Sequence, residues 1–332
     1  MTAYFRPLVQ HGPNRPPGSV PLAGQPLWFT HVERLSRKER PMIIAVQDVP
    51  GDALDRLTRP RADVAGLAMD RPHIMGILNA TPDSFSDGGV HNSVSAAQSA
   101  AEQMVSQNAT ILDIGGESTR PGATFVPEDE EIARTRPLIE AIKSRTDALI
   151  SIDTRKFAVA KAAWEAGAGL INDVTGFTFD PQLAPFCVKV GAPVCVMHMQ
   201  GDPGTMQDNP TYQDVLLDVY DFLEGQVDRL ENLGLDRDQI IIDPGIGFGK
   251  TEAHNLALLQ GISLFHGLGC PILLGVSRKG MIGQIGKEPR KDARAPGSIA
   301  VGLAGLSQGV QILRVHDVAE TAQALRLWAA VR

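Results

Sequence analysis

Short apolar runs recur along the chain, and each of them ends in polar or charged residues. Eight such runs occupy residues 74–79, 109–116, 148–154, 170–174, 193–198, 240–245, 271–277 and 312–316. Near-continuous runs of Val, Ile and Leu are typical of parallel strands that are buried on both faces. Helix-like sequence follows each run, so the pattern predicts eight strand–helix units. Eight units in about 260 residues is the size of one (β/α)8 barrel, which is the fold we predict.

Residues typical of helix ends separate the runs. Helix starts are indicated by Asn92–Ser93, Pro127–Glu128 and Asp180–Pro181. Glycines that suit a left-handed cap after a helix are Gly167, Gly191, Gly234, Gly269 and Gly309. Between 93 and 108 apolar residues recur at helical spacing, as expected for a side that faces the barrel. A doubly wound sheet also alternates strands and helices, but polar residues at nearly every strand end favour the closed barrel.

Residues 1–72 differ from the rest of the chain. They hold ten of the 23 prolines, and no strand–helix alternation is visible in them. The segment 41–49 is consistent with one strand, and 13–21 is typical of irregular coil. We therefore divide the chain into an N-terminal extension of unknown role, residues 1–72, and a catalytic (β/α)8 barrel, residues 73–332.

Composition narrows the class of protein. A hydrophobic share of 43% is enough for a large core, and the net charge of −7 argues against nucleic acid as the main partner. The three cysteines, Cys187, Cys195 and Cys270, form no CxxC pair, so we expect buried core residues and a reduced protein. No apolar signal core and no stretch of transmembrane length is present. We expect a cytoplasmic protein with small-molecule substrates, without nucleic-acid or membrane partners.

Barrels of this kind carry their chemistry at the carboxyl ends of the strands. Those ends hold Asn79, Asp113, Asp153, Asn172, His198, Asp243, Ser277, Arg314 and His316. Converging carboxylates and amides at residues 153, 172 and 243 suit a ligand rich in N–H donors, such as a 2-amino-4-oxo pyrimidine ring. Structural caps of the loops explain any one of these three side chains, but explain all three poorly.

Several loops at this end also carry candidate chemistry. Both a mobile lid and a solvated loop fit residues 79–89, whose polar and aromatic positions include Asp83, Phe85 and Asp87. Glycines and Arg120 between residues 115 and 122 can hold an anion or a carboxylate. Residues 243–250 match neither a phosphate loop nor a dinucleotide-binding motif. Cationic residues at 277–279 and 314–316 fit an anionic leaving group, whereas His198 between two methionines is better explained by packing.

These motifs together resemble the dihydropteroate synthase family, enzymes that join a pterin diphosphate to para-aminobenzoate. The matching stretches are IMGILNATPDSFSDGG, DIGGESTRPGA, SIDT, INDV, PVCVMHMQGDPGTMQ, DPGIGFGK, GVSRK and RVHD. They follow the family order and cover about 260 residues. The resemblance implies a (β/α)8 barrel, a homodimer, Mg²⁺ and release of pyrophosphate.

The resemblance also implies roles for individual residues. The pterin-binding residues would be Asp153, Asn172, Val174, Met197, Asp243, Phe248, Gly275, Lys279 and Arg314. The diphosphate would be held by Asn79, Thr119, Arg314 and His316, with Asn79 as the Mg²⁺ ligand. The para-aminobenzoate site would comprise Phe85, Thr119, Arg120, Pro121, Phe248 and Ser277. The catalytic set would be Asp87, Lys279, Arg314 and His316, with Asp87 facing the carbon that is substituted.

Two features depart from the family pattern. Gly280 stands where many relatives have a serine that helps to hold the carboxylate of para-aminobenzoate. This chain would use backbone N–H groups at the start of the following helix instead. Residues 1–72 have no counterpart in the minimal enzyme.

Three other functions compete with synthesis of dihydropteroate. Pterin-binding barrels of folate- or corrinoid-dependent methyltransferases share the pterin carboxylates, but do not need residues 119–121, 277–279 and 314–317 for a diphosphate and an arylamine. If the protein were a non-catalytic pterin-binding scaffold, we would expect at least one site residue to be replaced, and none is. A sugar-phosphate barrel enzyme has no need for the carboxylate and amide set at 153, 172 and 243. The synthase accounts for all of these residues.

Overall fold

The computed structural model describes residues 3–80, 90–118, 124–202 and 204–331. Its central sheet has eight parallel strands: β6 (His73–Asn79), β7 (Ile111–Gly115), β8 (Leu149–Asp153), β9 (Leu170–Asp173), β10 (Val194–Met197), β11 (Ile240–Asp243), β12 (Leu273–Leu274) and β13 (Ile312–Val315). The strands are hydrogen-bonded in the order β11-β10-β9-β8-β7-β6-β13-β12. A parallel bridge between Ile242 and Ile272 joins the two ends of this sheet. The predicted (β/α)8 barrel is confirmed.

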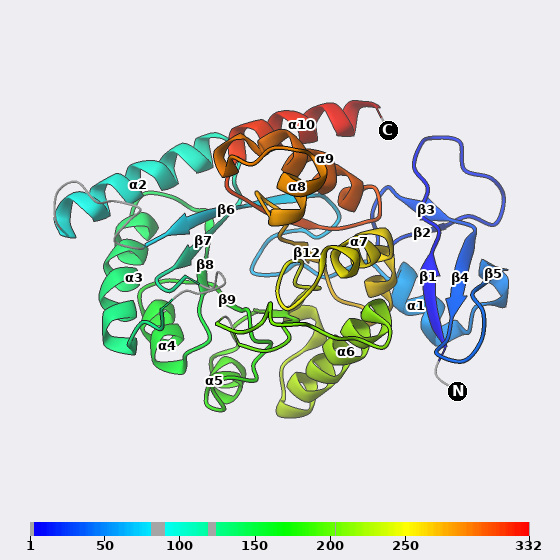
Figure 1. Ribbon diagram of the computed structural model, residues 1–332, viewed down its shortest axis with the longest axis horizontal. Helices are drawn as coiled ribbons and strands as arrows, with labels where there is room; N and C mark the ends of the chain where they lie inside the picture. Colours follow the sequence, from blue (N-terminus) through cyan, green and yellow to red (C-terminus); the bar gives the residue numbers. More distant parts are fainter. Residues whose placement is uncertain (1–2, 81–89, 119–123, 203, 332) are drawn as a thin grey trace.

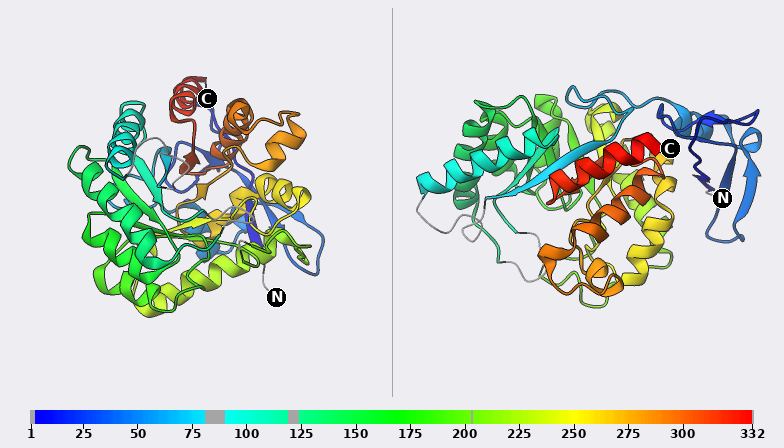
Figure 2. Two further views of the ribbon diagram at one scale, coloured as in Figure 1. Left: turned by 60° about the vertical axis from the view of Figure 1, so that its left-hand side comes forward. Right: turned by 90° about the horizontal axis from the view of Figure 1, so that it is seen from above.

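Helices form a ring around these strands (Figures 1 and 2). They are α2 (Val90–Ser106), α3 (Glu128–Lys143), α4 (Phe157–Glu165), α5 (Leu183–Val190), α6 (Val215–Leu233), α7 (Glu252–Gln260), α8 (Gly280–Ile285), α9 (Ala295–Leu306) and α10 (Val318–Val331). Short 3-10 helices are η3 (Arg237–Gln239), η4 (Ile262–Leu268) and η5 (Lys291–Ala293). Gly191 and Gly234 end α5 and α6 in the left-handed conformation that the sequence predicts for them.

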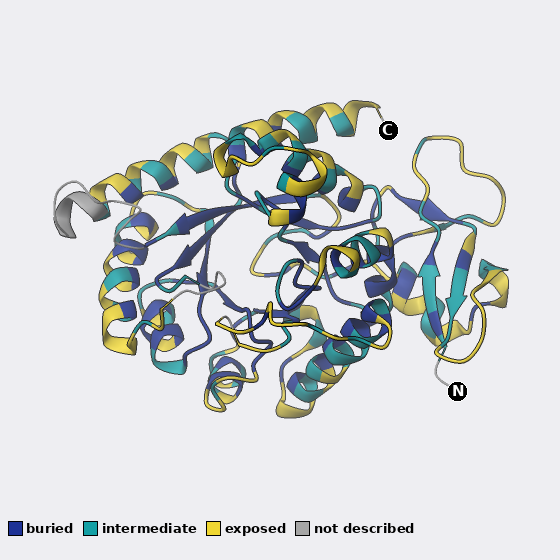
Figure 3. Cartoon of the chain, viewed as in Figure 1, coloured by how far each residue is buried: buried dark blue, intermediate teal, exposed yellow. Residues whose placement is uncertain are grey.

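The strands are buried along nearly their whole length, as Figure 3 shows. Every residue of β7, β9, β10 and β11 is buried, which explains why their sequences lack alternation. Helix α2 turns Ala97 and Ala101 to the core, as its spacing predicts, and begins at Val90, two residues before the predicted Asn92–Ser93 start.

Two strand assignments need correction. β12 has only two residues, so Gly275 and Ser277 lie in the segment after the strand and not within it. Asp113 is the third residue of β7, opposite Ser151 of β8, and not its end. Side chains alternate along a strand, so Asp113 shares its face with Ile111 and Gly115. The length of an apolar run alone did not reveal this register.

Residues 4–58 form a small antiparallel layer beside the barrel (Figure 1). Its sheet has the order β1-β4-β5, with β1 (Tyr4–Pro7), β4 (His31–Leu35) and β5 (Met42–Ala45). A two-stranded ribbon, β2 (Val20–Pro21) and β3 (Trp28–Phe29), and helix α1 (Gly51–Thr58) complete it. The segment 41–49 is only partly a strand, because the 3-10 helix η1 (Val46–Asp48) follows β5.

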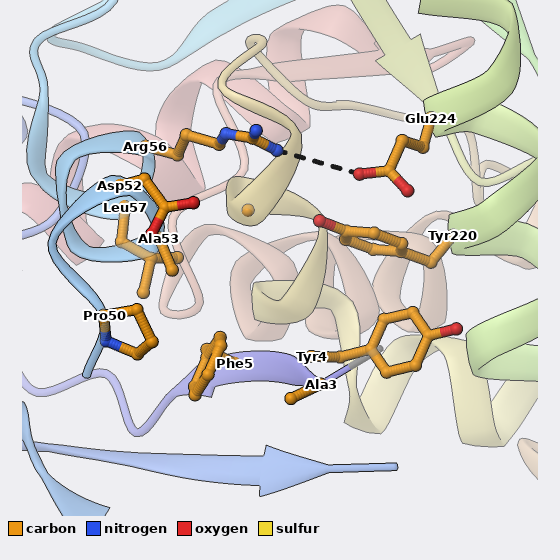
Figure 4. A pocket seen from close by; sticks show the side chains of 11 residues that line it. Ala3, Tyr4, Phe5, Pro50, Asp52, Ala53, Arg56, Leu57, Tyr220 and Glu224 are labelled. Atoms are coloured by element: carbon orange, nitrogen blue, oxygen red, sulfur yellow. Dashed lines mark ion pairs between the residues drawn. The ribbon is translucent and has the colours of Figure 1, made fainter. Parts of the chain in front are cut away.

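Polar contacts attach this layer to the barrel. The Tyr4 hydroxyl donates to Asp221 at 2.8 Å, and the Ser263 hydroxyl donates to the carbonyl of Pro7 at 3.0 Å. A cavity of about 240 Å³ remains between the two parts, beside the Arg56–Glu224 ion pair (Figure 4). The layer is therefore anchored to the outside of the barrel without complete packing.

The segment between this layer and β6 closes one end of the barrel. Val64 and Met69 are buried against a cluster built from residues near the starts of the strands, including Met75, Ile111 and Ile312. The polar residues of interest lie toward the opposite ends of the strands. Val64 and Met69 thus belong to the barrel interior, whereas the candidate site lies at the other mouth. No helix within the described residues is long and apolar enough to cross a membrane.

Candidate active site

A buried ion-pair cluster lies at the carboxyl ends of the barrel strands. The Arg314 side chain, from β13, donates through Nε to Asp113 Oδ2 at 2.6 Å and through Nη2 to Asp153 Oδ2 at 2.7 Å. Asp113 is fully buried, and Asp153 is 7% exposed. Two carboxylates share one guanidinium, so the cluster carries a net charge of −1 when both are ionised.

Asp113 is the hydrogen-bonding centre of this cluster. In addition to Arg314, it accepts the Ser151 hydroxyl at 2.6 Å, and both its oxygens lie 3.4 Å from Asn172 Nδ2. These donors come from three strands: β8 and β9 on one side of β7, and β13, which lies beyond β6 on the other side. Sequence reasoning placed Asp113 among the strand ends but assigned it no role. A charged residue inside an otherwise apolar run was the available signal.

Burial changes the protonation of these groups. Desolvation raises the pKa of Asp153 to about 7; Arg314 lowers it in part, and Asp113 adds to the rise. Burial opposes charge on Arg314, but the carboxylates of Asp113 and Asp153 hold its pKa above the ordinary value. Asp153 Oδ1 is buried and has no hydrogen-bond partner within the described part of the chain. The site thus contains an acceptor that a ligand N–H can satisfy.

Asp243 reaches the same region from β11. Its Oδ1 accepts the backbone N–H of Gly245 at 2.7 Å, and burial raises its pKa, a rise that this hydrogen bond reduces. Gly275 lies between Asp243 and Arg314: a Cβ there would be 3.8 Å from Asp243 Oδ2 and 4.0 Å from Arg314 Cβ. The absence of a side chain at 275 leaves space between these two charged groups.

Lys279 and Phe248 form one wall beside Asp243. The Lys279 ammonium lies 4.0 Å from the centre of the Phe248 ring, a cation–π distance. Lys279 is the residue immediately before α8, and Phe248 belongs to the loop after β11. Val174, which follows β9, and Met197, the last residue of β10, are both buried.

His316, a predicted diphosphate residue, is hydrogen-bonded to Ser277, a predicted para-aminobenzoate residue. The Ser277 hydroxyl lies 3.1 Å from the backbone nitrogen of His316, which donates to it, and 3.0 Å from His316 Nδ1. This contact ties the segment after β12 to the end of β13. Asn79 is the half-buried last residue of β6, opposite Gly115.

Five predicted site residues lie outside the described residues, namely Phe85, Asp87, Thr119, Arg120 and Pro121. The described chain on both sides of residues 119–123 is held by Lys156, which is 1% exposed. Its ammonium donates to Glu117, to the carbonyl of Val126 and, at 2.6 Å, to Glu131. Sequence reasoning missed this network, because only the fold brings its acidic and basic residues together.

The described residues at this mouth offer few ligands to a Mg²⁺ ion. The described residues contain no group of three or more His, Cys, Asp or Glu side chains that could hold a metal ion. Asn79 offers a single amide oxygen. Mg²⁺ commonly keeps several waters and binds through one or two protein ligands together with substrate phosphates, so a single amide oxygen fits a metal carried by a diphosphate.

Residues 75–316 match the family of pterin binding enzymes. The chain is also 45% identical over 266 residues to the dihydropteroate synthase of Escherichia coli K12, an alignment that covers 80% of this chain and 94% of that protein. The chain belongs to the dihydropteroate synthase family. The synthase of Haemophilus influenzae Rd is similarly related, at 46% identity over 264 residues, covering 80% and 95% of the two chains.

Solved dihydropteroate synthases share the fold. A Yersinia pestis synthase in a sulfonamide drug complex has a TM-score of 0.77 at 44% identity and covers 82% of this chain and 99% of its own. A Xanthomonas albilineans synthase with 4-aminobenzoic acid has a TM-score of 0.77 at 45% identity, with coverages of 82% and 98%. The protein is therefore a transferase of folate biosynthesis, which condenses 6-hydroxymethyl-7,8-dihydropterin diphosphate with para-aminobenzoate.

Proposed function

We propose that the pterin ring of this dihydropteroate synthase binds with its N–H edge against Asp153, Asn172 and Asp243. The observation that carries this assignment is the buried Asp153 Oδ1, which lacks a partner within the described residues. A 2-amino-4-oxo pterin presents adjacent N–H donors that would satisfy it and the free side of Asp243. Lys279 would donate to an acceptor on the ring, and Phe248, Val174, Met197 and Gly275 would line its faces.

Arg314 has two tasks in this proposal. Its Nε and Nη2 hold Asp113 and Asp153, which aligns the carboxylate for the pterin. The plane of its guanidinium would lie against the pterin ring. Its positive charge, together with the other cations at this mouth, would attract the diphosphate. Asn79, Thr119 and His316 would complete the diphosphate site. The para-aminobenzoate would lie between Phe248, Ser277 and the loop residues Phe85, Thr119, Arg120 and Pro121.

The reaction breaks the bond between the pterin methylene carbon and the diphosphate oxygen. The electron pair leaves with pyrophosphate, and the amine nitrogen of para-aminobenzoate forms the new C–N bond and loses a proton. Mg²⁺ bound near Asn79 would supply charge stabilisation to the departing pyrophosphate. Because an arylamine is a weak nucleophile, we propose that the C–O bond breaks first, and that Asp87 offsets the positive charge on the methylene carbon. No covalent enzyme intermediate is formed.

One assay tests both the activity and the order of bond changes. Pyrophosphate and dihydropteroate are measured from the pterin diphosphate and Mg²⁺, with and without para-aminobenzoate. We expect dihydropteroate only with the arylamine, and scrambling of an ¹⁸O label out of the bridging position without it. Pterin binding without turnover would support a methyltransferase-like barrel or a non-catalytic scaffold. A covalent pterinyl-enzyme trapped by acid quench and detected by mass spectrometry would contradict the dissociative step.

We also propose that the enzyme is a cytoplasmic homodimer. Leu327 and Val331 of α10 are 63% and 81% exposed and lie four residues apart, so they share one face of the helix. An exposed apolar helix face is suited to contact with a second copy. Sedimentation velocity should give a dimer for the natural chain, and Leu327→Glu should give a monomer; a monomer for both would contradict the proposal.

A further inference from the structure

Lys250 is a buried lysine that sequence reasoning left without a role. It ends the loop 243–250 and is 3% exposed. Its ammonium nitrogen lies 2.8 Å from His198 Nδ1, 2.9 Å from the carbonyl oxygen of Gly245 and 3.0 Å from that of Phe248, with the carbonyl of His198 further away at 3.3 Å. The amine thus contacts two carbonyls of its own loop, those of Gly245 and Phe248, and the side chain of His198, which follows β10.

The number of donors matches the number of close acceptors. Burial lowers the pKa of Lys250 to about 7, although the Asp243 carboxylate opposes this fall. When protonated, the amine has three N–H groups, and its three shortest contacts are all to acceptors. Burial, with a further contribution from Lys250, lowers the pKa of His198 to about 2, so its imidazole is neutral. A protonated Lys250 can only donate, so Nδ1 then accepts from it and the ring proton resides on Nε2. The ring is also fixed by edge-to-face packing on Phe222, with centroids 4.9 Å apart.

The loop has a shape that needs an internal support. Gly245, Gly247 and Gly249 all have positive φ values, of 69°, 82° and 62°. At residue 245 a Cβ would lie 1.9 Å from the carbonyl oxygen of His198, so the loop wraps closely around the end of β10. This close wrapping turns the carbonyls of residues 245 and 248 toward the Lys250 ammonium, which is the donor that satisfies them.

Each of these two carbonyls belongs to a residue that sets part of the pterin pocket. The N–H of Gly245 donates to Asp243 Oδ1 at 2.7 Å, so the position of this residue orients the carboxylate. The Phe248 ring lies under the Lys279 ammonium at 4.0 Å. By binding these two carbonyls, Lys250 is linked through the backbone to the Asp243 carboxylate and to the Phe248–Lys279 wall.

We propose that Lys250 is a positioning residue of this enzyme: by holding the carbonyls of Gly245 and Phe248 it fixes Asp243 and the Phe248–Lys279 wall for the pterin, without touching substrate. This inference rests on the proposed placement of the pterin. Displacement of binding groups by fractions of an ångström weakens a site much more than it weakens a fold. A lysine that only stabilised the fold would instead change the melting temperature and leave pterin affinity unchanged.

The test compares Lys250→Met with Arg61→Met. Arg61 is another buried cation, 8% exposed, which donates to the carbonyls of Arg56, Arg59 and His266 far from the mouth. Both substitutions remove N–H donors from buried carbonyls, and both should lower the melting temperature. Binding of 6-hydroxymethylpterin, which has no leaving group, is then measured by fluorescence titration at a temperature where each variant is folded.

We expect Lys250→Met to weaken pterin binding by about tenfold, the effect of roughly one lost interaction with a polar group, and to raise KM for the pterin diphosphate with kcat within about threefold. Arg61→Met should leave both unchanged. Pterin affinity of folded Lys250→Met within twofold of the natural enzyme would overturn the inference. Failure of the natural enzyme itself to bind pterin would contradict the proposed function instead.

A second variant, Lys250→Gln, provides a test if Lys250→Met does not fold. Lys250→Gln retains two N–H donors on a shorter side chain and should give an intermediate loss of pterin affinity, about threefold. If Lys250→Met does not fold, an unchanged pterin affinity in folded Lys250→Gln overturns the inference in the same way.

Discussion

Replacement of Arg314 by methionine removes the guanidinium that separates Asp113 from Asp153. The two hydrogen bonds that it makes, at 2.6 and 2.7 Å, are both to nearly inaccessible carboxylates, while its own side chain is 22% exposed. Loss of one partner from a buried ion pair typically costs about 3–5 kcal/mol, because the remaining charge stays buried without compensation. We expect Arg314→Met to lower the free energy of unfolding by about that amount at pH 8.

The cost should depend on pH in a defined direction. The folded-state pKa of Asp153 is about 7, above the value of about 3.9 in an unfolded chain. A raised carboxyl pKa contributes stability that is fully present below about pH 4 and is lost as pH rises through about 7. Without Arg314 the pKa of Asp153 rises further, so a proton can replace the missing cation. The loss of stability in Arg314→Met should therefore be smaller at pH 5.5 than at pH 8.

Urea unfolding followed by circular dichroism at both pH values measures these changes. Asp113→Asn is the matched partner: it keeps the side-chain shape and should cost about 1.5–3 kcal/mol as one lost charged hydrogen bond. The double variant should lose at least about 1 kcal/mol less than the sum of the two single variants, since removal of one carboxylate charge relieves the repulsion. Additive losses, or a loss below about 1 kcal/mol for Arg314→Met at pH 8, would refute this reasoning.

Three further predictions concern the proposed substrate sites. Lys279→Ala should lower kcat/KM by an amount equivalent to roughly 2–4 kcal/mol, the effect of losing one preorganised donor, and a change below threefold would show that the role is misassigned. Gly280→Ser should fold normally, because a Cβ there meets no atom within 4 Å among the described residues. The serine hydroxyl should lower KM for para-aminobenzoate about threefold, and an unchanged KM would place the carboxylate elsewhere. Pterin affinity of the natural enzyme should rise with pH through about 7 as Asp153 ionises, and this dependence, followed by fluorescence titration, should be lost in Asp153→Asn; its persistence would assign the titration to another group.

The barrel could be predicted because its signal is local and repeated. Buried parallel strands require apolar runs, and runs such as 194–197 and 240–243 are buried along their whole length. The residues after these runs are brought to one mouth by the topology alone, since all the strands point the same way. This is why Asp153, Asn172 and Asp243 could be proposed as neighbours before their contacts were known.

The sequence by itself determined the fold class, the family and the set of polar residues at the barrel mouth, because each of these is encoded in short contiguous stretches. Only the tertiary structure decided how those residues are paired. Asp113 became the centre of the cluster because the register of β7 turns it inward between Ser151 and Arg314. Lys250 acquired a role because three glycines with positive φ fold its loop around His198. Hydrogen bonds between residues 38 to 201 positions apart depend on strand register and loop path, and neither is specified by the local pattern of apolar and polar residues.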